Sequence, residues 1–300
     1  MRYDAIIVGG SYAGLSAALA LVRARKRVLI IDAGQRRNRF AHTAHGFLGQ
    51  DGRAPDAIAR DARAEVADYP TVTFLDGSAI AAALGDDGFT VTVEGGATHT
   101  AARLILATGI VDELPDLPGL REGWGKGVLH CPYCHGYEVA GRRLGVLAFS
   151  PLATHLANLI PEWGPTTFLT NGAVALSAPE RAALAARGVT VEDGAVAAVL
   201  NAGEGLAGVR LHDGRTVALD ALFIAVPWRQ VSPLAAQLGC ALDDTALGPV
   251  IRVDATGRTS VPGVYAAGDV ATMMKSLPAA TASGYLAGAA AHQSLLPPAH

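Results

Sequence analysis

Hydrophobic and polar positions follow a strand–helix–strand order at the start of the chain. The apolar run Tyr3–Val8 precedes the turn sequence Gly9–Gly14 and an Ala/Leu-rich segment that reaches about Arg25. A second apolar run, Val28–Ile31, ends at the acidic residue Asp32. An apolar run, a Gly-rich turn and a helical segment in this order predict a βαβ unit of the dinucleotide-binding type.

Shorter elements follow this unit. A helical pattern near Ala57–Ala67 leads into alternating runs at Val72–Phe74 and Phe89–Val93, which predict a small β-meander. Arg103–Ala107 is again a buried strand, and it ends at Thr108–Gly109. The first part of the chain therefore reads as one lobe built on a largely buried sheet.

The second half repeats the pattern of the first. The Pro/Gly-rich passage Leu114–Gly127 reads as a linker. A strand, a turn and a helix follow within Leu144–Ile160, so two related lobes are expected. Further strands are predicted near Thr166–Leu169, Val189–Val191 and Ala221–Val226, and the chain closes with a strand at Val264–Ala267 and a helix at Ala279–His292. The closing strand and helix most simply rejoin the first lobe.

Composition narrows the class of protein. The chain has 300 residues, of which 50% are hydrophobic and 17% are charged, so it can bury one large core or two moderate ones. The formal net charge is -3 and no block of like charges occurs, so neither a nucleic acid nor a membrane is expected as a partner. The start of the chain lacks the features of a secretory signal, and no apolar run is long enough to span a bilayer. A soluble cytoplasmic protein is expected.

Three cysteines are present, and two of them are three residues apart. Cys131 and Cys134 are flanked by His130 and His135. In a reducing compartment this spacing indicates either a redox-active pair or half of a zinc site. Adjacent His-Cys and Cys-His pairs in one short loop converge poorly on a tetrahedral ion, so the redox pair is preferred and no metal is expected. Cys240 is predicted to be a small buried hydrophobic residue.

Two further motifs suit a nucleotide cofactor. In the first turn, Gly9 permits a tight strand-to-helix connection, Gly14 lets the helix pack closely, and Ser11 replaces the middle glycine of the usual pattern. Asp32 lies where it can bind a ribose hydroxyl. Near the end of the chain, Gly268-Asp269 follows a strand, and this carboxylate can accept a hydrogen bond from a sugar-like hydroxyl or, alternatively, cap a helix.

Taken together, the Gly9–Gly14 turn, Asp32, Thr108-Gly109, the Cys131/Cys134 pair and Gly268-Asp269 resemble the low-molecular-weight thioredoxin reductase family over essentially the whole chain. The resemblance implies an α/β fold of two Rossmann-like domains. One is a discontinuous FAD domain formed by residues 1–112 and 229–300. The other is a central NAD(P)H-binding-like domain, residues 113–228, which carries the cysteines.

The resemblance also implies roles for these residues and an assembly state. Gly9, Ser11, Gly14 and Asp32 would hold the ADP half of FAD. Asp269 would hold the ribityl chain, and Thr108, Gly109 and Gly268 would complete the cofactor site. Cys134 would face the flavin, and Cys131 would exchange with substrate. A homodimer is expected.

The second nucleotide turn departs from the family pattern. The sequence reads Ala148–Ala153 where the family has glycines, and Pro151 intrudes. Thr170–Ala173 stands where typical members place a basic cluster for the 2′-phosphate, and no arginine occurs before Arg181. Close phosphate approach and selective NADPH binding therefore have no visible basis, and NADPH is a doubtful cofactor.

The cysteine motif departs as well. His135 replaces the aspartate of ordinary thioredoxin reductases, and the run Cys131–Glu138 resembles the dithiol oxidases of gliotoxin- and holomycin-type metabolites. The Arg-Gln pair usual near the flavin is also missing from Lys275–Ala280, where Pro278 stands in its place.

The resulting hypothesis is an enzyme that oxidises a small dithiol, or a thioredoxin-like protein, with O2 as acceptor and His135 as the base. The alternatives are an NADPH-dependent disulfide reductase, a ferredoxin-driven reductase and a redox sensor without turnover.

Overall fold

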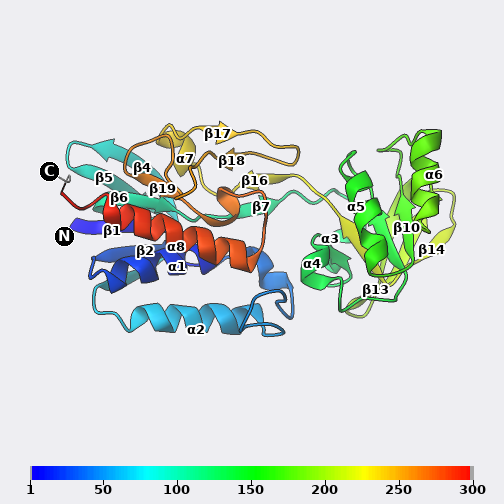
Figure 1. The fold of residues 1–300 in the computed structure, drawn as a ribbon, viewed down its shortest axis with the longest axis horizontal. Helices are drawn as coiled ribbons and strands as arrows, with labels where there is room; N and C mark the ends of the chain where they lie inside the picture. The colour runs from blue at the N-terminus through cyan, green and yellow to red at the C-terminus, as the bar shows by residue number, and fades with distance from the viewer. Residues whose placement is uncertain (1, 298–300) are drawn as a thin grey trace. The chain divides into compact units, whose positions relative to one another are not determined.

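The computed structural model describes residues 2–297 and separates them into two compact units (Figure 1). The described residues of the first unit are 2–39, 47–111 and 228–297. The second unit contains Phe40–Gly46 and Asp112–Pro227. Residues 40–46 were expected in the FAD domain, but the structure groups them with the cysteine-bearing unit.

The first unit is built on a seven-stranded sheet in the order β3-β2-β1-β6-β5-β4, with β19 also paired to β6. β6 pairs with β5 near its start, and its residues Leu104 to Leu106 pair in parallel with β19. The pairing of β6 with β19 joins the last strand of the chain to the first lobe, as predicted. The strands are β1 (Arg2–Val8), β2 (Val28–Asp32), β3 (Val72–Asp76), β4 (Ala79–Gly85), β5 (Gly88–Val93), β6 (Thr98–Leu106) and β19 (Val264–Ala266).

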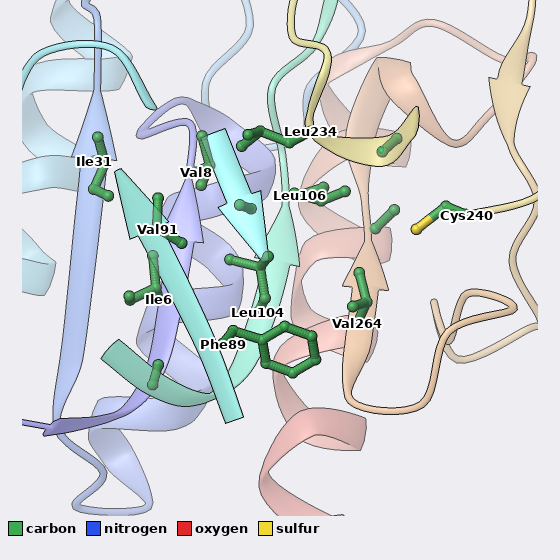
Figure 2. Packing of buried hydrophobic residues seen from close by; sticks show 14 of the residues in the cluster. Ile6, Val8, Ile31, Phe89, Val91, Leu104, Leu106, Leu234, Cys240 and Val264 are labelled. Carbon is green, nitrogen blue, oxygen red and sulfur yellow. The ribbon is translucent and has the colours of Figure 1, made fainter. Parts of the chain in front are cut away.

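Helices α1 (Tyr12–Arg23) and α8 (Leu277–Gln293) lie side by side in this unit (Figure 1). A Cβ atom on Gly284 would come within 2.1 Å of the Ala13 carbonyl oxygen, so the two helices approach at backbone distance. The sheet buries a continuous apolar cluster that includes Ile6, Leu104 and Phe89, and Cys240 is buried in it, as predicted (Figure 2). The smaller elements are η1 (Arg37–Phe40), α2 (Pro55–Ala67), β7 (Ile110–Asp112), β16 (Trp228–Gln230), α7 (Leu234–Gln237), β17 (Leu242–Asp243), β18 (Val250–Ile251) and η3 (Gly268–Val270).

The second unit repeats the parallel architecture. Its five-stranded sheet has the order β11-β10-β9-β15-β8, with all pairs parallel, and a separate antiparallel sheet has the order β12-β13-β14. Because side chains alternate along a strand, Leu147 and Leu222 enter one apolar cluster while Val146 and Phe223 enter the other. The strands are β8 (Val128–Leu129), β9 (Leu144–Leu147), β10 (Thr166–Leu169), β11 (Thr190–Glu192), β12 (Val196–Ala202), β13 (Gly205–Leu211), β14 (Thr216–Ala218) and β15 (Ala221–Ile224).

The helical elements of this unit are short: α3 (Leu120–Gly123), α4 (Pro132–His135), α5 (Ala153–Leu159), η2 (Ile160–Glu162) and α6 (Ala178–Ala186). The two units together confirm the predicted α/β class with two Rossmann-like sheets. Within the described residues, no helix combines the length and the apolar character needed to cross a bilayer.

An ion pair links the residue before β9 to the residue before β15. Arg143 donates to Asp220 from its backbone N–H at 2.9 Å, from Nε at 2.9 Å and from a terminal guanidinium nitrogen at 2.6 Å. These hydrogen bonds from Arg143 lower the pKa of Asp220 to about 2. This ion pair therefore stabilises the folded unit at every pH at which Asp220 is ionised.

We expect Asp220→Asn to destabilise the protein by about 1 kcal/mol at neutral pH, because it removes an ion pair at the protein surface. The folded-state pKa lies below the unfolded value of about 3.9. The difference between wild type and variant is therefore complete above about pH 3.9, and it disappears as the pH falls through about 2. Urea midpoints of both proteins over this range measure it, with the exposed Asp244→Asn as the control. An equal loss at every pH contradicts the assignment to this carboxylate.

Candidate functional site

The β1–α1 turn of the first unit is shaped by its glycines. Gly9 has φ 104°, and a Cβ atom there would lie 2.2 Å from the carbonyl oxygen of Ala107 and 3.2 Å from the backbone nitrogen of Thr108. A Cβ atom on Gly14 would lie 1.8 Å from the Gly9 carbonyl oxygen. Only glycine therefore permits this tight turn and this close approach of helix to strand. The predicted residue Thr108 is consequently brought beside the turn, and Gly109 follows it with φ 69°.

The first turn of α1 offers backbone donors. Ser11 occupies the N-cap position, but its side chain caps no helix N–H group. The earliest intrahelical bond runs from Leu15 to the Ser11 carbonyl, and no carbonyl of residues 2–297 accepts from the N–H groups of Ala13 or Gly14. Uncapped N–H groups at the start of a helix are the donors that bind a pyrophosphate.

Asp32 lies directly against this turn. A Cβ atom on Gly10 would lie 2.8 Å from Cβ and 3.0 Å from Oδ2 of Asp32. On the segment after β2, the Nε atom of Arg36 and the Oδ1 atom of Asn38 are buried and have no hydrogen-bond partner within residues 2–297. The turn, the carboxylate and these polar atoms fit the nucleotide part of FAD, since each presents a group that a phosphate or a ribose can bind.

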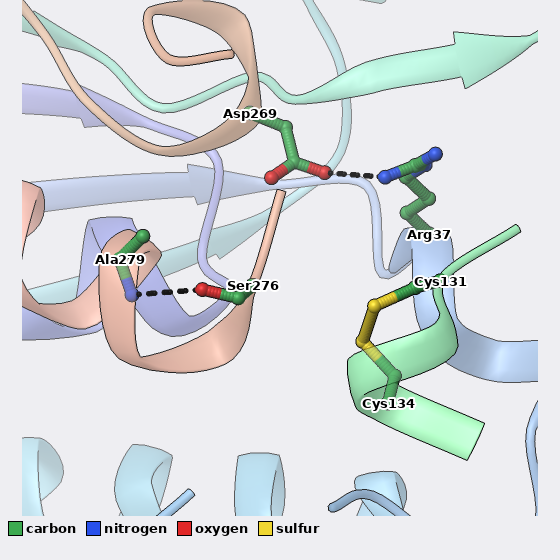
Figure 3. The surroundings of a disulfide bond; sticks show 6 residues. All are labelled: Arg37, Cys131, Cys134, Asp269, Ser276 and Ala279. Carbon is green, nitrogen blue, oxygen red and sulfur yellow. Dashed lines mark hydrogen bonds and ion pairs between the residues drawn. A yellow bond between two sulfur atoms is a disulfide. The ribbon is translucent and has the colours of Figure 1, made fainter. Parts of the chain in front are cut away.

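Gly268 and Asp269 form the start of η3 after β19. The Gly268 N–H donates to Ser283 Oγ at 3.0 Å, and the Asp269 carboxylate pairs with Arg37 at 3.3 Å (Figure 3). Lys275 donates from Nζ to the Asp269 carbonyl oxygen at 2.6 Å. Asp269 is thus held by an ion pair rather than by capping of η3, which has no side-chain cap.

The predicted cysteine pair is joined in a disulfide in the second unit (Figure 3). Cys131 follows the edge strand β8 and precedes the single turn α4, in which Pro132 occupies the first position. This turn brings the two Cα atoms to 5.3 Å, within the range a disulfide spans. Within residues 2–297, no three His, Cys, Asp or Glu side chains gather as a metal site would require.

Gly136 packs closely against Trp163 and so determines the path of the backbone after α4. A Cβ atom on Gly136 would lie 2.5 Å from the Pro132 carbonyl oxygen and 2.7 Å from Nε1 of Trp163. The ring of Trp163 in turn meets that of Tyr133 edge-on, with 5.8 Å between the ring centroids. The backbone around the disulfide is therefore closely packed on this side, while Tyr133 itself is exposed.

His135 follows the second cysteine and is half-buried. Burial lowers the pKa of His135, the charge of Glu138 raises it, and His45 lowers it. The imidazole is thus favoured in its neutral form, which is the form that accepts a proton. His45 comes from the segment Phe40–Gly46, and its Nε2 atom lies 3.4 Å from Oε1 of Glu138.

The β9–α5 turn of the second unit differs from the β1–α1 turn. The N–H groups of Ala153, Thr154 and His155 donate to the carbonyls of Ser150, Pro151 and Leu152 at 3.1 Å each. The donors that α1 leaves open are therefore occupied in α5. The N–H groups of Ala13 and Gly14, at the matching positions of α1, have no such partner among residues 2–297.

Side chains that follow β10 are also hydrogen-bonded to other residues of the second unit. Asn171 donates to the Ala148 carbonyl at 3.2 Å and accepts from the Val196 N–H at 2.8 Å. Arg181 donates to Asp193 at 2.8 Å. The first arginine after β10 is therefore paired with a carboxylate, and Asn171 links the residue after β9 to the first residue of β12.

Comparisons with known proteins agree with this geometry. A family model described as pyridine nucleotide-disulphide oxidoreductase matches residues 3–149 and 166–284. The chain belongs to this family.

Two curated family members illustrate the likeness. Thioredoxin reductase tcpT of Claviceps purpurea is 36% identical over 98% of this chain and 94% of its own. Thioredoxin reductase sirT of Leptosphaeria maculans is 32% identical over 95% and 92% of the two chains.

Solved structures show the same relationship. An oxidoreductase from Agrobacterium tumefaciens is 48% identical, covers both chains completely and has a TM-score of 0.95. The protein HlmI is 39% identical over 98% of this chain and 92% of its own, with a TM-score of 0.90. The predicted family is thereby confirmed, and the chain is a thioredoxin reductase-like, FAD-dependent thiol–disulfide oxidoreductase.

Several residues of these sites lie outside the predicted set. Gly10 is one of them, although the Gly-Gly pair that begins the turn is a usable signal. Arg37 and His45 carried no signal of their own, because their partners Asp269 and Glu138 are far away in the sequence. Such contacts become visible only when the chain is folded.

Proposed function

We propose that the protein oxidises a substrate dithiol to a disulfide through Cys131 and Cys134, with FAD as cofactor, O2 as acceptor and little or no use of NADPH. The observation that carries this proposal is the disulfide held on α4 with the half-buried, neutral-favoured His135 immediately after it. A disulfide accepts a thiolate, and a neutral imidazole beside it can generate one.

FAD residues are assigned from the first unit. Gly9, Ser11, Gly14 and Asp32 would hold the ADP half, with Gly10 leaving room for Asp32. The remaining contacts are assigned to Thr108, Gly109, Gly268 and Asp269. When bound, FAD supplies a two-electron acceptor for the cysteine pair.

The thiol chemistry follows from the cysteines and His135. A substrate thiol gives its proton to an imidazole nitrogen of His135, and the thiolate attacks Sγ of Cys131. The Cys131–Cys134 bond breaks as the mixed disulfide forms, and Cys134 leaves as a thiolate. The second substrate thiol, after losing its proton, attacks the substrate sulfur of the mixed disulfide and releases Cys131. The substrate leaves as a disulfide, and the overall balance is dithiol plus O2 to disulfide plus hydrogen peroxide.

The second unit supports the proposed independence from NADPH. The N–H groups at the start of α5 are hydrogen-bonded, Asn171 is hydrogen-bonded to two backbone groups, and Arg181 is paired with Asp193. A 2′-phosphate would need positive charge and free donors at this edge of the sheet.

Anaerobic mixing tests the proposal. The flavin absorbance of the oxidised enzyme should bleach rapidly with a panel of small dithiols and not with NADPH or NADH. Admission of air should restore the colour and yield hydrogen peroxide. Rapid bleaching by NADPH together with no response to dithiols would overturn the proposal in favour of a disulfide reductase.

Substitution of the proposed base, His135, should lower the rate by an amount that depends on pH. We expect His135→Gln to lower kcat/KM for dithiol oxidation by about 10² near neutral pH, because general-base catalysis is lost. The loss should shrink as the pH rises through about 8.5, where substrate thiols ionise unaided. Initial rates of oxygen uptake across this range measure the effect, with His42→Gln as the control. A loss that is independent of pH argues against a role as base.

A further inference from the structure

We propose that Arg36 and Asn38 recognise the ADP half of FAD and make the protein select FAD over FMN. Arg36 would donate from Nε to a phosphate oxygen on the adenosine side, and Oδ1 of Asn38 would accept from a ribose hydroxyl. The inference rests on the FAD site proposed for the first unit and not on the proposed thiol chemistry. It assigns a role to two residues that lie outside the Gly-rich turn and the other cofactor motifs.

Hydrogen bonds of fixed direction orient the amide of Asn38. The Tyr12 hydroxyl donates to the carbonyl oxygen of Pro55 at 3.0 Å, and a carbonyl oxygen can only accept. Because this bond uses the one hydroxyl proton of Tyr12, its oxygen accepts from Nδ2 of Asn38, which lies 3.2 Å away. Tyr12 is buried, and burial raises the pKa of its hydroxyl, so the proton is retained. Oδ1 of Asn38 is therefore left as an acceptor.

Oδ1 of Asn38 and Nε of Arg36 are both shielded from solvent. Neither atom has a hydrogen-bond partner in the part of the chain that the structure describes. The guanidinium of Arg36 is held in place, because its Nη2 atom pairs with Asp56. Buried polar atoms without a partner are destabilising, so a fixed donor and a fixed acceptor indicate a ligand that offers the complementary groups. The phosphates and the ribose of ADP offer both.

Both side chains are tied to the start of α1. Asn38 donates to Tyr12, the first residue of this helix, and the N–H groups that follow Tyr12 are the proposed pyrophosphate donors. Asp56, which pairs with Arg36, directly follows Pro55, which accepts from Tyr12. The unpartnered donor and acceptor are therefore held at the same end of α1 as the proposed pyrophosphate donors.

The residue between them connects to the other part of the cofactor site. Arg37 pairs with Asp269, which the family resemblance assigns to the ribityl chain (Figure 3). Residues 36–38 thus contact both parts of the proposed site, which the pyrophosphate of FAD would join. FMN ends at the ribityl phosphate and has no adenosine. Contacts from Arg36 and Asn38 to the adenosine side would therefore favour FAD over FMN.

Displacement of FAD from the holoenzyme tests the inference. Asn38→Leu removes Oδ1 at a similar side-chain volume, and it should weaken FAD binding about tenfold, as expected for the loss of one hydrogen bond. FMN lacks the ADP half, so added FMN should displace FAD from this variant at roughly tenfold lower concentration than from the wild type. Added ADP loses the same contact as FAD, so its displacing concentration should not change. The FAD that stays bound after gel filtration measures both effects.

Two further variants examine the donor and the orientation of the amide. Arg36→Lys keeps a positive charge near Asp56 but has no N–H group at the Nε position, so FMN should again displace FAD at about tenfold lower concentration. Tyr12→Phe removes the hydroxyl that orients Asn38. Because the amide can then rotate, we expect a smaller change of about threefold.

The chain offers matched controls for both side chains. Asn158 donates to the Thr154 carbonyl at 2.9 Å, and Arg63 donates to Asp76 at 3.0 Å. Neither residue is assigned to the FAD site, so Asn158→Leu and Arg63→Lys should leave the displacing concentration of FMN unchanged.

An unchanged displacing concentration of FMN in Asn38→Leu would overturn the inference, as would an equal change in the controls. A general weakening of the fold lowers FAD and FMN binding alike, so it also leaves this concentration unchanged. A protein that shows the expected change with FMN, but whose flavin is not reduced by dithiols, would contradict the proposed thiol chemistry alone. Rapid reduction by dithiols without the change would contradict the present inference alone.

Discussion

Replacement of Cys131 or Cys134 by serine should reduce dithiol oxidation by at least about 10³-fold, because either change removes the disulfide that accepts the substrate thiolate. The two variants should nevertheless differ. In Cys134→Ser, the remaining Cys131 thiol should form one mixed disulfide per chain with an aromatic disulfide probe, since Cys131 is proposed to exchange with substrate. In Cys131→Ser, the corresponding reaction of Cys134 should be much slower. Oxygen uptake and mass spectrometry of the labelled protein measure these outcomes.

Cys240→Ala is the matched control for both variants. Its sulfur is buried in the core of the first unit, and burial raises the pKa of this thiol, so it should neither react nor affect turnover. All three variants should retain the flavin spectrum of the wild type. Substantial dithiol oxidation in either serine variant would show that electrons reach the flavin by another path.

Gly14→Ala should yield protein without bound flavin. The added Cβ would lie 1.8 Å from a backbone carbonyl oxygen, which cannot move without displacing α1 from β1. Overpacking of this kind costs about 1–3 kcal/mol, and it also moves the N–H groups proposed to bind the pyrophosphate. Absorbance of the purified protein and its urea midpoint report the two effects separately.

Gly10→Ala is a milder change at the same turn. Its Cβ would lie 2.8 Å from Cβ of Asp32, a milder overlap than the 1.8 Å contact at Gly14, so stability should fall less than in Gly14→Ala while flavin affinity falls by roughly tenfold. Gly85→Ala is the control, because a Cβ there would meet only one atom, at 3.8 Å. Normal flavin content in both Gly10→Ala and Gly14→Ala would remove this turn from the cofactor site.

Much of this fold can be predicted from the local pattern of apolar residues and glycines. The apolar run before Gly9, the turn itself and the run that ends at Asp32 predict β1, α1 and β2 because buried parallel strands and Gly-rich turns leave clear traces in sequence. The missed strand β4 shows the limit of such traces. Its sequence is rich in alanine and lacks alternation, and it is a strand because it pairs antiparallel with β5.

The functional residues also divide into those that the sequence predicts and those that it does not. The cysteines and His135 are neighbours in sequence, so their chemistry could be proposed before the fold was known. Arg37 with Asp269, and His45 with Glu138, join residues that are distant in the chain. No periodicity or spacing encodes these partners, since they depend on how the separate segments fold together.

The grouping of Phe40–Gly46 with the central unit has a mechanical consequence. The backbone passes from one unit to the other after residues 39, 46, 111 and 227, so four peptide segments connect them where a simple insertion would have two. Any hinge rotation must then be absorbed by φ and ψ changes at four places together. The segment Phe40–Gly46 thus adds two covalent connections to the two that a simple insertion would have.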